Sequence, residues 1–371
     1  MRIAVNTRTL LPNKLGGIGW FTLETLERMT RNHPNDEFFF FFDRKYDEKY
    51  LFSDNITPIV VSPPARHPLL FWYWFEKALP PRLAKIQPDL FLSPDGYISL
   101  KTKVPTLAVI HDINFHHYPN DFPYLVRRYY NHFFPRFVAH AKRIATVSQF
   151  SKQDIHNTYH KELSKIDVVY NGINKLYKLN CKNVDKQNLT DKPYFLFVSS
   201  LSPRKNVEKL FEGFDLFKKR TSNEVQLIIV GDKMFWTTQM EETYSNMSFK
   251  DEVIFPDYVE PNELVALYRN ALALTFVPYF EGFGIPIIEA MTCNIPVLTA
   301  NASATKEVAG DAALLVDPFN EKQIAEGMYR LFNEPELRNE LIEAGKKQAA
   351  KFSWDTTSDL LWNSVEKTVN Q

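Results

Sequence analysis

The sequence has few cysteines, no long apolar run and no excess charge of either sign. Cys181 and Cys293 are the two cysteines in 371 residues, and neither has a CxxC partner or a His-rich neighbourhood. A disulfide framework and a structural zinc site are therefore not expected, and a reducing compartment fits best. Lys and Arg together number 44, as do Asp and Glu. That balance argues against a protein that wraps nucleic acid.

Secreted and membrane-spanning classes are not expected either. The N-terminus, MRIAVNTRTLL, has no basic region followed by a sustained apolar run, and no window approaches the roughly 20 apolar residues of a membrane span. The most apolar stretch, residues 69–75, is bounded by Pro68 and Glu76 and is too short to cross a bilayer. The sequence thus predicts a soluble, cytoplasmic protein.

Charge is unevenly distributed along the chain. Residues 1–170 hold 22 Lys and Arg against 16 Asp and Glu, whereas residues 171–371 hold 22 against 28. The N-terminal half is therefore the one suited to an anionic partner or surface. Residues 69–75 with Lys77, Arg82 and Lys85 suit docking on anionic lipid, peripheral at the inner face of the membrane, and burial in an ordinary core is the alternative.

The sequence does contain short apolar runs that alternate with helical patterns, which is typical of parallel α/β sheets. In the first half the predicted strands cover residues 2–6, 37–42, 57–61, 89–93, 106–110, 143–147 and 167–170. In the second half they cover residues 194–199, 225–230, 252–255, 273–277, 296–299 and 313–316. We expect two doubly wound, Rossmann-like domains at 1–177 and 193–352, a polar linker at 178–192, and a C-terminal helix at 353–371 that packs across the junction.

Three short motifs in the first half follow predicted strands. Gly16 and Gly17 precede a helix expected to begin near Trp20, where free N–H groups suit a phosphate, although the spacing is not that of a dinucleotide fingerprint and a tight turn is the alternative. His111 directly follows a strand, at the edge where open α/β sheets bind ligands, and a capping or core histidine is the alternative. Asn171 begins an Asn-Gly pair, for which a structural turn is the default interpretation.

The second half carries the motif PRKN after the 194–199 strand. Arg204 and Lys205 stand where the next helix begins, and Asn206 is the expected N-cap of that helix. Two cations there oppose the helix dipole, which makes sense if an anion such as a diphosphate binds them. A solvated surface pair is the alternative.

A sharper motif, EGFGIPIIEA, follows the 273–277 strand. Glu281 lies in a glycine-containing loop, Pro286 suits a first helical turn, and Glu289 falls within the helix. Carboxylates on either side of a helix start can accept hydrogen bonds from sugar hydroxyls, one set on a transferred sugar and one on a ribose. Their different placement argues against the paired acid and base of a glycoside hydrolase.

Together these motifs resemble the retaining, nucleotide-sugar-dependent glycosyltransferases of the GT-B fold, family 4, which includes bacterial mannosyl- and glucosyltransferases of surface polysaccharides. The resemblance spans essentially the whole chain, and the E-x7-E spacing of Glu281 and Glu289 is its most specific part. It implies two Rossmann-like domains that face a central cleft, the first for the acceptor and the second for the donor. It also implies transfer of a hexose, mannose favoured, from a nucleotide-diphosphate sugar to a glycan or lipid-linked acceptor.

The resemblance also implies roles for single residues. Arg204 and Lys205 would neutralise the donor diphosphate, and Glu289 would hold the ribose. Glu281 would bind the donor sugar, and His111 would touch that sugar near its anomeric carbon. The other implied donor-binding positions are Gly16, Gly17, Asn171, Ser199, Phe283, Gly284, Ile285, Tyr258 and Val259. No enzymic nucleophile and no cofactor is expected, and no metal, because the chain has no Asp-x-Asp pair.

Departures from the family pattern leave the donor open. Ser199 and Ser200 stand where many relatives have Gly-Arg, Asp257 replaces a frequent glycine near the nucleobase, and Asn294 replaces a glycine in a position that suits a left-handed cap. GDP-mannose is favoured, with UDP-glucose, UDP-galactose and UDP-N-acetylglucosamine as alternatives. Outside this activity the alternatives are a sugar epimerase, a phosphorylase and a catalytically silent nucleotide-sugar-binding protein.

Overall fold

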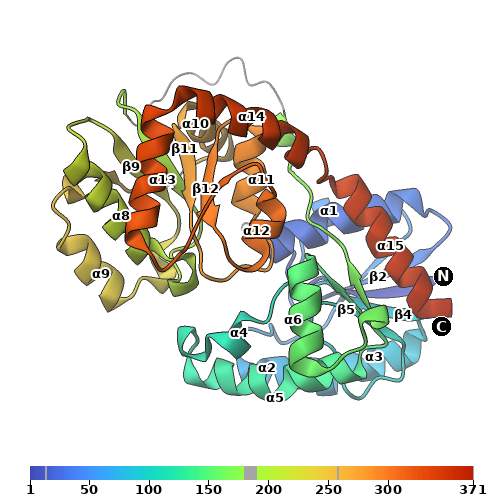
Figure 1. Ribbon diagram of the computed structural model, residues 1–371. Helices are drawn as coiled ribbons and strands as arrows, with labels where there is room; N and C mark the ends of the chain where they lie inside the picture. The colour runs from blue at the N-terminus through green and yellow to red at the C-terminus, as the bar shows by residue number, and fades with distance from the viewer. Residues whose placement is uncertain (13–14, 179–189, 257–258, 371) are drawn as a thin grey trace. The chain divides into compact units, whose positions relative to one another are not determined.

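A computed structural model describes residues 1–12, 15–178, 190–256 and 259–370. Residue contacts divide the chain into two compact units, Met1–Gly172 with Ser353–Gln371, and Ile173–Phe352. Each unit contains one parallel sheet with helices on both of its faces (Figure 1). The predicted fold class, two doubly wound Rossmann-like units, is confirmed.

The first sheet has the strand order β3-β2-β1-β4-β5-β6-β7 within the described residues. Its strands are β1 (Arg2–Asn6), β2 (Glu37–Phe42), β3 (Ile56–Val60), β4 (Leu90–Ser93), β5 (Thr106–Val109), β6 (Arg143–Thr146) and β7 (Ile166–Val168). All of these strands were predicted, β1 and β2 with the same ends and the others with ends that differ by one or two residues. Ile3 of β1 pairs with Phe38 of β2 on one side and with Leu90 of β4 on the other. The strand order therefore reverses between β1 and β4, where open α/β sheets form a ligand crevice.

Helices from both ends of the chain cover this sheet (Figure 1). One face carries α1 (Gly17–Asn32) and α15 (Trp354–Asn370), joined by a stack of Trp362 on His33 with ring centroids 3.5 Å apart. The prediction that α1 begins near Trp20 is wrong by about one turn, because Gly16 already supplies the extended N-cap backbone. The other helices of this unit are α2 (Pro68–Tyr73), α3 (Leu79–Ile86), α4 (Asn114–His117), α5 (Tyr124–His140) and α6 (Gln149–Tyr159). None of the described helices is both long and apolar enough to cross a membrane.

The second sheet has the order β10-β9-β8-β11-β12-β13 within the described residues. Its strands are β8 (Tyr194–Val198), β9 (Gln226–Val230), β10 (Val253–Ile254), β11 (Ala273–Phe276), β12 (Val297–Ala300) and β13 (Leu314–Val316). Each of them was predicted, with ends that differ by at most one residue. The order reverses between β8 and β11, so the loops after these two strands flank the crevice of this unit.

Helices pack closely on the second sheet. α8 (Val207–Arg220) packs on α13 (Glu321–Asn333), where a Cβ on Gly213 would lie 2.6 Å from Cγ2 of Ile324. Asn294 has a φ of 60°, so the left-handed cap expected there is confirmed. The remaining helices are α7 (Lys175–Lys178), α9 (Thr238–Ser245), α10 (Pro261–Asn270), α11 (Ile285–Thr292), α12 (Ser303–Ala309) and α14 (Pro335–Ala349).

The chain enters the second unit at Ile173, five residues before the boundary expected after residue 177. The reason is α7, whose Tyr177 packs edge to face on Tyr268 of α10 with ring centroids 5.7 Å apart. Most of the expected linker, 178–192, lies outside the described residues, and so does Cys181. The segment after Phe352 belongs to the first unit.

Candidate functional site

The two motifs of the second unit meet at the reversal of its strand order. PRKN lies in the loop after β8 and forms a single helical turn, Pro203–Lys205, while Glu281 lies in the loop after β11. Nη1 of Arg204 donates to Oε1 of Glu281 over 2.6 Å, and Nζ of Lys205 donates to the same oxygen. The solvated surface pair considered for these two cations is therefore excluded in favour of an ion cluster with one carboxylate.

The environment of this cluster favours its charged form. Lys205 and Glu281 are both buried. Burial by itself raises the pKa of Glu281, but the neighbouring charges of Arg204 and Lys205 outweigh it and hold that pKa below its ordinary value. One carboxylate therefore faces two cations, and the cluster can accept a further anion at neutral pH.

Asn206 stands at the N-cap position of α8, as predicted, but the prediction that its side chain caps the helix is wrong. Its backbone is left-handed, with a φ of 63°, and this turns the amide away from the helix. Nδ2 instead donates to the carbonyls of Val277, at 2.8 Å, and Pro318, at 2.7 Å. Asn206 thereby ties the loop after β8 to the loops after β11 and β13.

The start of α11 is shaped by its glycine. Gly284 has a φ of 107°, in the left-handed region that favours glycine, and it precedes Ile285 at the first helical position. Phe283 is buried, and its ring packs edge to face on Phe352 with ring centroids 5.5 Å apart. The backbone N–H of Glu281 donates to Oγ of Ser303 at 3.0 Å, which fixes this loop to α12.

Glu289 of α11 is held by two tyrosines that the sequence motifs did not reveal. The hydroxyl of Tyr268 donates to Oε2 of Glu289 at 2.8 Å, and the phenol of Tyr177 also donates to this carboxylate. Burial raises the pKa of Glu289 above its ordinary value, although the two phenol hydrogen bonds oppose that rise. Nothing in the local sequence links Glu289 to residues on α7 and α10, so no signal was available to find them.

The predicted position Ser199 directly follows β8. The N–H of Ser199 donates to the carbonyl of Val230 at 3.0 Å. A Cβ on Gly231 would lie 1.8 Å from the carbonyl oxygen of Ser199, so there is no room for a larger residue at position 231. Val259 is partly buried. Tyr258 lies outside the described residues, and so does Asp257.

In the first unit, the predicted glycines and histidine lie at the carboxyl edge of the sheet. Gly16 and Gly17 are exposed and line a cavity of about 440 Å³ together with Arg8, Arg44 and Arg66. The ring of His111 packs edge to face on Phe21, and burial lowers its pKa.

The tautomer of His111 follows from its partner. Nε2 lies 2.8 Å from the carbonyl oxygen of Pro94, and a carbonyl can only accept. Nε2 therefore carries the proton, and Nδ1 is left as an acceptor for a hydroxyl.

Asn171 is buried, and the glycine after it has a packing role. A Cβ on Gly172 would lie 2.2 Å from the backbone nitrogen of Trp354. The Asn-Gly pair thus lets α15 approach the end of the first sheet, in line with the structural interpretation.

A polar network at the reversal of the first sheet was missed. Nδ2 of Asn6 donates to Oδ1 of Asp95 at 2.8 Å, and Nε of Arg8 donates to Oδ2 of the same residue at 2.7 Å. Arg8 also lies over the ring of Tyr97, 4.3 Å from its centroid. Burial lowers the pKa of Arg8, but its neighbours, Asp95 first among them, together more than offset this and raise that pKa above its ordinary value. Arg8 and Asp95 follow β1 and β4, the two strands that flank the reversal, so the positional rule applied to His111 could have found them.

The described residues contain no group of three His, Cys, Asp or Glu side chains arranged to hold a metal ion. Comparison with known proteins then decides the family. A model described as "Glycosyltransferase Family 4" matches residues 15–175, and one described as "Glycosyl transferases group 1" matches residues 182–348. The O-antigen chain mannosyltransferase RfbU of Salmonella typhimurium is 31% identical over 254 residues, which are 68% of this chain and 67% of that protein. The chain belongs to glycosyltransferase family 4.

One further sequence relative and two solved structures agree with this family assignment. The O-antigen chain mannosyltransferase B of Escherichia coli is 25% identical over 96% of this chain and 95% of that protein. Among solved structures, sucrose-phosphate synthase from Thermosynechococcus elongatus has a TM-score of 0.79 and Anabaena HepE in complex with UDP-glucose one of 0.74. Both are 17% identical and cover 99% of this chain, with 98% and 100% of their own chains covered. At that identity the likeness shows the fold, which is GT-B.

Proposed function

We propose that this glycosyltransferase moves a hexose, mannose favoured, from a nucleotide-diphosphate sugar to a glycan or lipid-linked acceptor in surface polysaccharide synthesis. The proposal includes retention of the anomeric configuration and no need for a metal ion or cofactor. The observation that carries it is the cluster of Arg204, Lys205 and Glu281 at the strand reversal. The names of the O-antigen relatives, which are mannosyltransferases, support the choice of sugar and pathway.

The cluster fits a donor because it can exchange one anion for another. In the absence of ligand the carboxylate of Glu281 neutralises the two cations. A bound diphosphate would take over Arg204 and Lys205 with charge-assisted hydrogen bonds, and the oxygens of Glu281 would then accept from hydroxyls of the sugar. The backbone of Phe283, Gly284 and Ile285 at the start of α11 would face the same group.

The reaction needs stabilisation of the leaving group. The acceptor hydroxyl attacks the anomeric carbon, the bond from that carbon to the phosphate oxygen breaks, and the phosphate oxygen takes the proton of the hydroxyl. Negative charge grows on the diphosphate during this step, and preorganised cations and amides lower the barrier by stabilising it. Because attack and departure occur on one face of the sugar, no enzymic nucleophile is required.

The other predicted residues complete the donor site in this proposal. Glu289, held by its two tyrosines, accepts from the ribose hydroxyls. Gly16 and Gly17 present backbone N–H groups to the donor, and His111 offers Nδ1 to a sugar hydroxyl. Asn171, Ser199, Tyr258 and Val259 stay predictions from the family resemblance.

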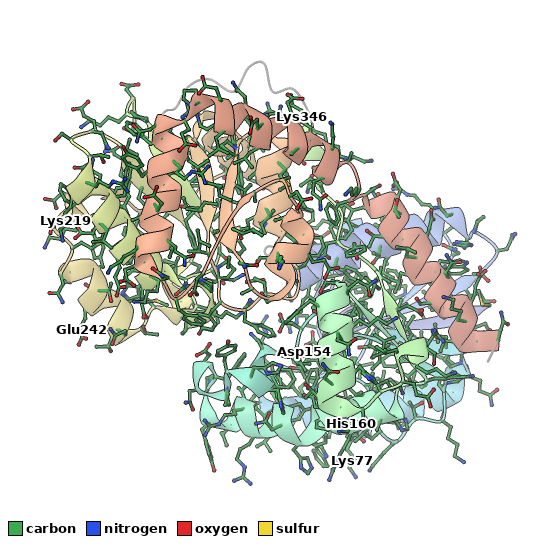
Figure 2. The ribbon with its side chains drawn as sticks, viewed as in Figure 1. Lys77, Asp154, His160, Lys219, Glu242 and Lys346 are labelled. Atoms are coloured by element: carbon green, nitrogen blue, oxygen red, sulfur yellow. The ribbon has the colours of Figure 1, made fainter. Side chains whose placement is uncertain are left out.

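The proposal also includes contact of the first unit with an anionic membrane. Of residues 69–75, Trp74 and Phe75 are buried in the core, whereas Leu69 is 71% exposed and Trp72 and Tyr73 are also exposed. Lys77, labelled in Figure 2, lies over the ring of Trp72, 5.8 Å from its centroid. Neighbouring α5 adds exposed Tyr124 and Leu125 with two arginines over the Tyr124 ring, Arg127 and Arg128. Apolar side chains beside cations are the composition that interfacial helices use.

Flotation tests this surface. The protein should float with phosphatidylglycerol vesicles and not with phosphatidylcholine vesicles, and Leu69→Glu should reduce the floating fraction. Leu163→Glu, at an exposed leucine of the same unit away from α2 and α5, is the matched control. Protein that stays in solution with both vesicles contradicts membrane contact.

A direct assay tests the reaction. The full chain is incubated with GDP-mannose or with each UDP-sugar, with and without EDTA, and release of the nucleoside diphosphate and the anomer of the product are measured. Selective turnover of GDP-mannose, an unchanged anomeric configuration and no effect of EDTA are expected. Turnover of a UDP-sugar alone would correct the donor, and a strict metal requirement would remove the metal-free mechanism. Nucleotide binding without any turnover would favour a catalytically silent protein.

A further inference from the structure

A second cavity of the first unit lies outside the site described so far. It has a volume of about 600 Å³ and is bounded by the outer face of α1 and by the segment around η1 (Glu48–Tyr50). That volume falls within the roughly 300–1,000 Å³ of small-molecule sites. The lining residues are Leu11, Pro12, Leu15, Trp20, Leu23, Glu27, Arg31, Lys49, Tyr50, Leu51 and Phe52.

This cavity adjoins the one that contains the predicted glycines. Leu11 lines both cavities, and the N-terminal end of α1 separates them, with the N-cap Gly16 and Gly17 lining one cavity and Trp20 lining the other. In the proposed function the two glycines face the donor. The larger cavity therefore lies next to the proposed position of the donor, along the surface of the same unit.

The face of α1 that lines the cavity is not used by the core. Trp20, Leu23, Glu27 and Arg31 follow one another at helical spacing, while the buried side of the helix is formed by other residues. Trp20 is 39% exposed, in the first turn of the helix. Such a stripe of mixed apolar and charged side chains is not required for packing of α1.

Two hydrogen bonds hold the opposite wall in place. Nζ of Lys49 donates to the carbonyl of Pro12 at 2.7 Å, and the hydroxyl of Tyr50 donates to the carbonyl of Leu11 at 2.6 Å. They join the segment after β1 to the segment after β2. The cavity thus has fixed walls on both sides of the α1 stripe.

We propose that this cavity is a distal subsite for the acceptor glycan, which holds sugar units that precede the acceptor hydroxyl. A hexose ring has a face of C–H groups and a belt of hydroxyls, and the lining matches both. The Trp20 ring offers an apolar surface for the C–H face. Glu27 and Arg31, paired at 2.9 Å, offer an acceptor and donors for the hydroxyls. This inference rests on the proposed function and deepens it, because it makes the acceptor an oligosaccharide and gives the chain-length preference a location.

The test is binding of methyl α-mannoside and of α-linked manno-oligosaccharides of two to four units to the full chain, by calorimetry. For the native protein affinity should rise with length. Trp20→Ala should weaken the longest ligand about three- to tenfold, the range expected for one aromatic contact, and should leave methyl α-mannoside unchanged. Leu163→Ala, at a residue 39% exposed on the same unit and outside the cavity, is the control and should leave every ligand unchanged.

A second variant separates the subsite from the integrity of α1. Arg31→Gln, in the last turn of the helix, keeps Trp20 and should also reduce the gain with length. Affinity that does not depend on length, or an equal loss for the shortest and longest ligands, overturns the inference. If Trp20→Ala weakens binding of a polyprenyl phosphate but not of the oligosaccharides, the inference is also overturned, because the cavity would then hold lipid. Thermal stabilisation of the protein by nucleoside diphosphates is measured separately. If this stabilisation is absent, the proposed function itself has failed, and not only the inference about the cavity.

Discussion

Nη1 of Arg204 lies 2.6 Å from Oε1 of Glu281, although the two residues are 77 positions apart in the chain. The contact joins the loops after two neighbouring strands of the second sheet. Lys205 shares the same oxygen, so one carboxylate controls the charge that a donor diphosphate would meet.

Replacing Glu281 by Gln should separate the two tasks proposed for it. Transfer should fall about 10²- to 10³-fold, since the sugar loses a charged acceptor in the reacting complex. A nucleoside diphosphate without sugar should bind more tightly than to the native protein, because its competitor for Arg204 and Lys205 has lost its charge. Turnover and calorimetry measure the two effects, and Glu343→Gln, at an exposed ion pair with Lys346, is the control. Weaker nucleotide binding in Glu281→Gln would contradict the anion exchange.

The stability of the cluster should depend on pH in one direction. The pKa of Glu281 lies below its ordinary value of 4.5, so the folded state favours the charged carboxylate. The resulting stabilisation is present above pH 4.5 and is lost as pH falls through the folded pKa. Near pH 7 Glu281→Gln should therefore unfold more easily than the native protein by about 3 kcal/mol, as expected when one partner of a buried pair is removed. Denaturant unfolding from pH 7 downwards should show this difference shrinking below pH 4.5, and a constant difference would contradict it.

Two glycines should respond to alanine in opposite ways. A Cβ on Gly231 would lie 1.8 Å from the carbonyl oxygen of Ser199, so Gly231→Ala should cost about 3 kcal/mol of stability. Gly16 has no atom within 4 Å of that position, and Gly16→Ala should change stability by less than about 0.5 kcal/mol. If its backbone faces the donor, Gly16→Ala should nevertheless raise the KM for the donor several-fold. An unchanged KM would remove Gly16 from the donor site.

Tyr268→Phe should report on the positioning of Glu289. Loss of the phenol hydrogen bond raises the pKa of Glu289 further and loosens the carboxylate, so the acidic limb of nucleotide binding should move to higher pH. Affinity for GDP or UDP should fall about three- to tenfold, and the fall should be smaller for the 2′-deoxy nucleotide, which lacks one ribose hydroxyl. Tyr194→Phe removes a buried phenol that donates to the carbonyl of Leu267, outside the site, and should leave both properties unchanged.

The sequence predicted those features whose signal is local. Strand positions follow from apolar runs, whereas the contact of Arg204 with Glu281 depends on a strand order that was not predicted. The family resemblance implied only that both residues meet the same donor. Asn206 stands at the N-cap as predicted, but its side chain does not cap α8, because its amide donates instead to carbonyls of Val277 and Pro318, far away in the chain. Tyr177 and Tyr268 were missed for the same reason, since only the folded chain brings α7 and α10 to Glu289.

The return of α15 to the first unit has a consequence for synthesis of the chain. Oγ1 of Thr357 donates to the carbonyl of Tyr170 at 2.6 Å, and the ring of Trp362 packs beside Phe38 of β2. The part of this face that α15 covers, beside α1, therefore stays exposed on the ribosome until residues 354–370 have been made. The second unit, which is continuous from Ile173 to Phe352, can finish folding before the first, although it is translated later.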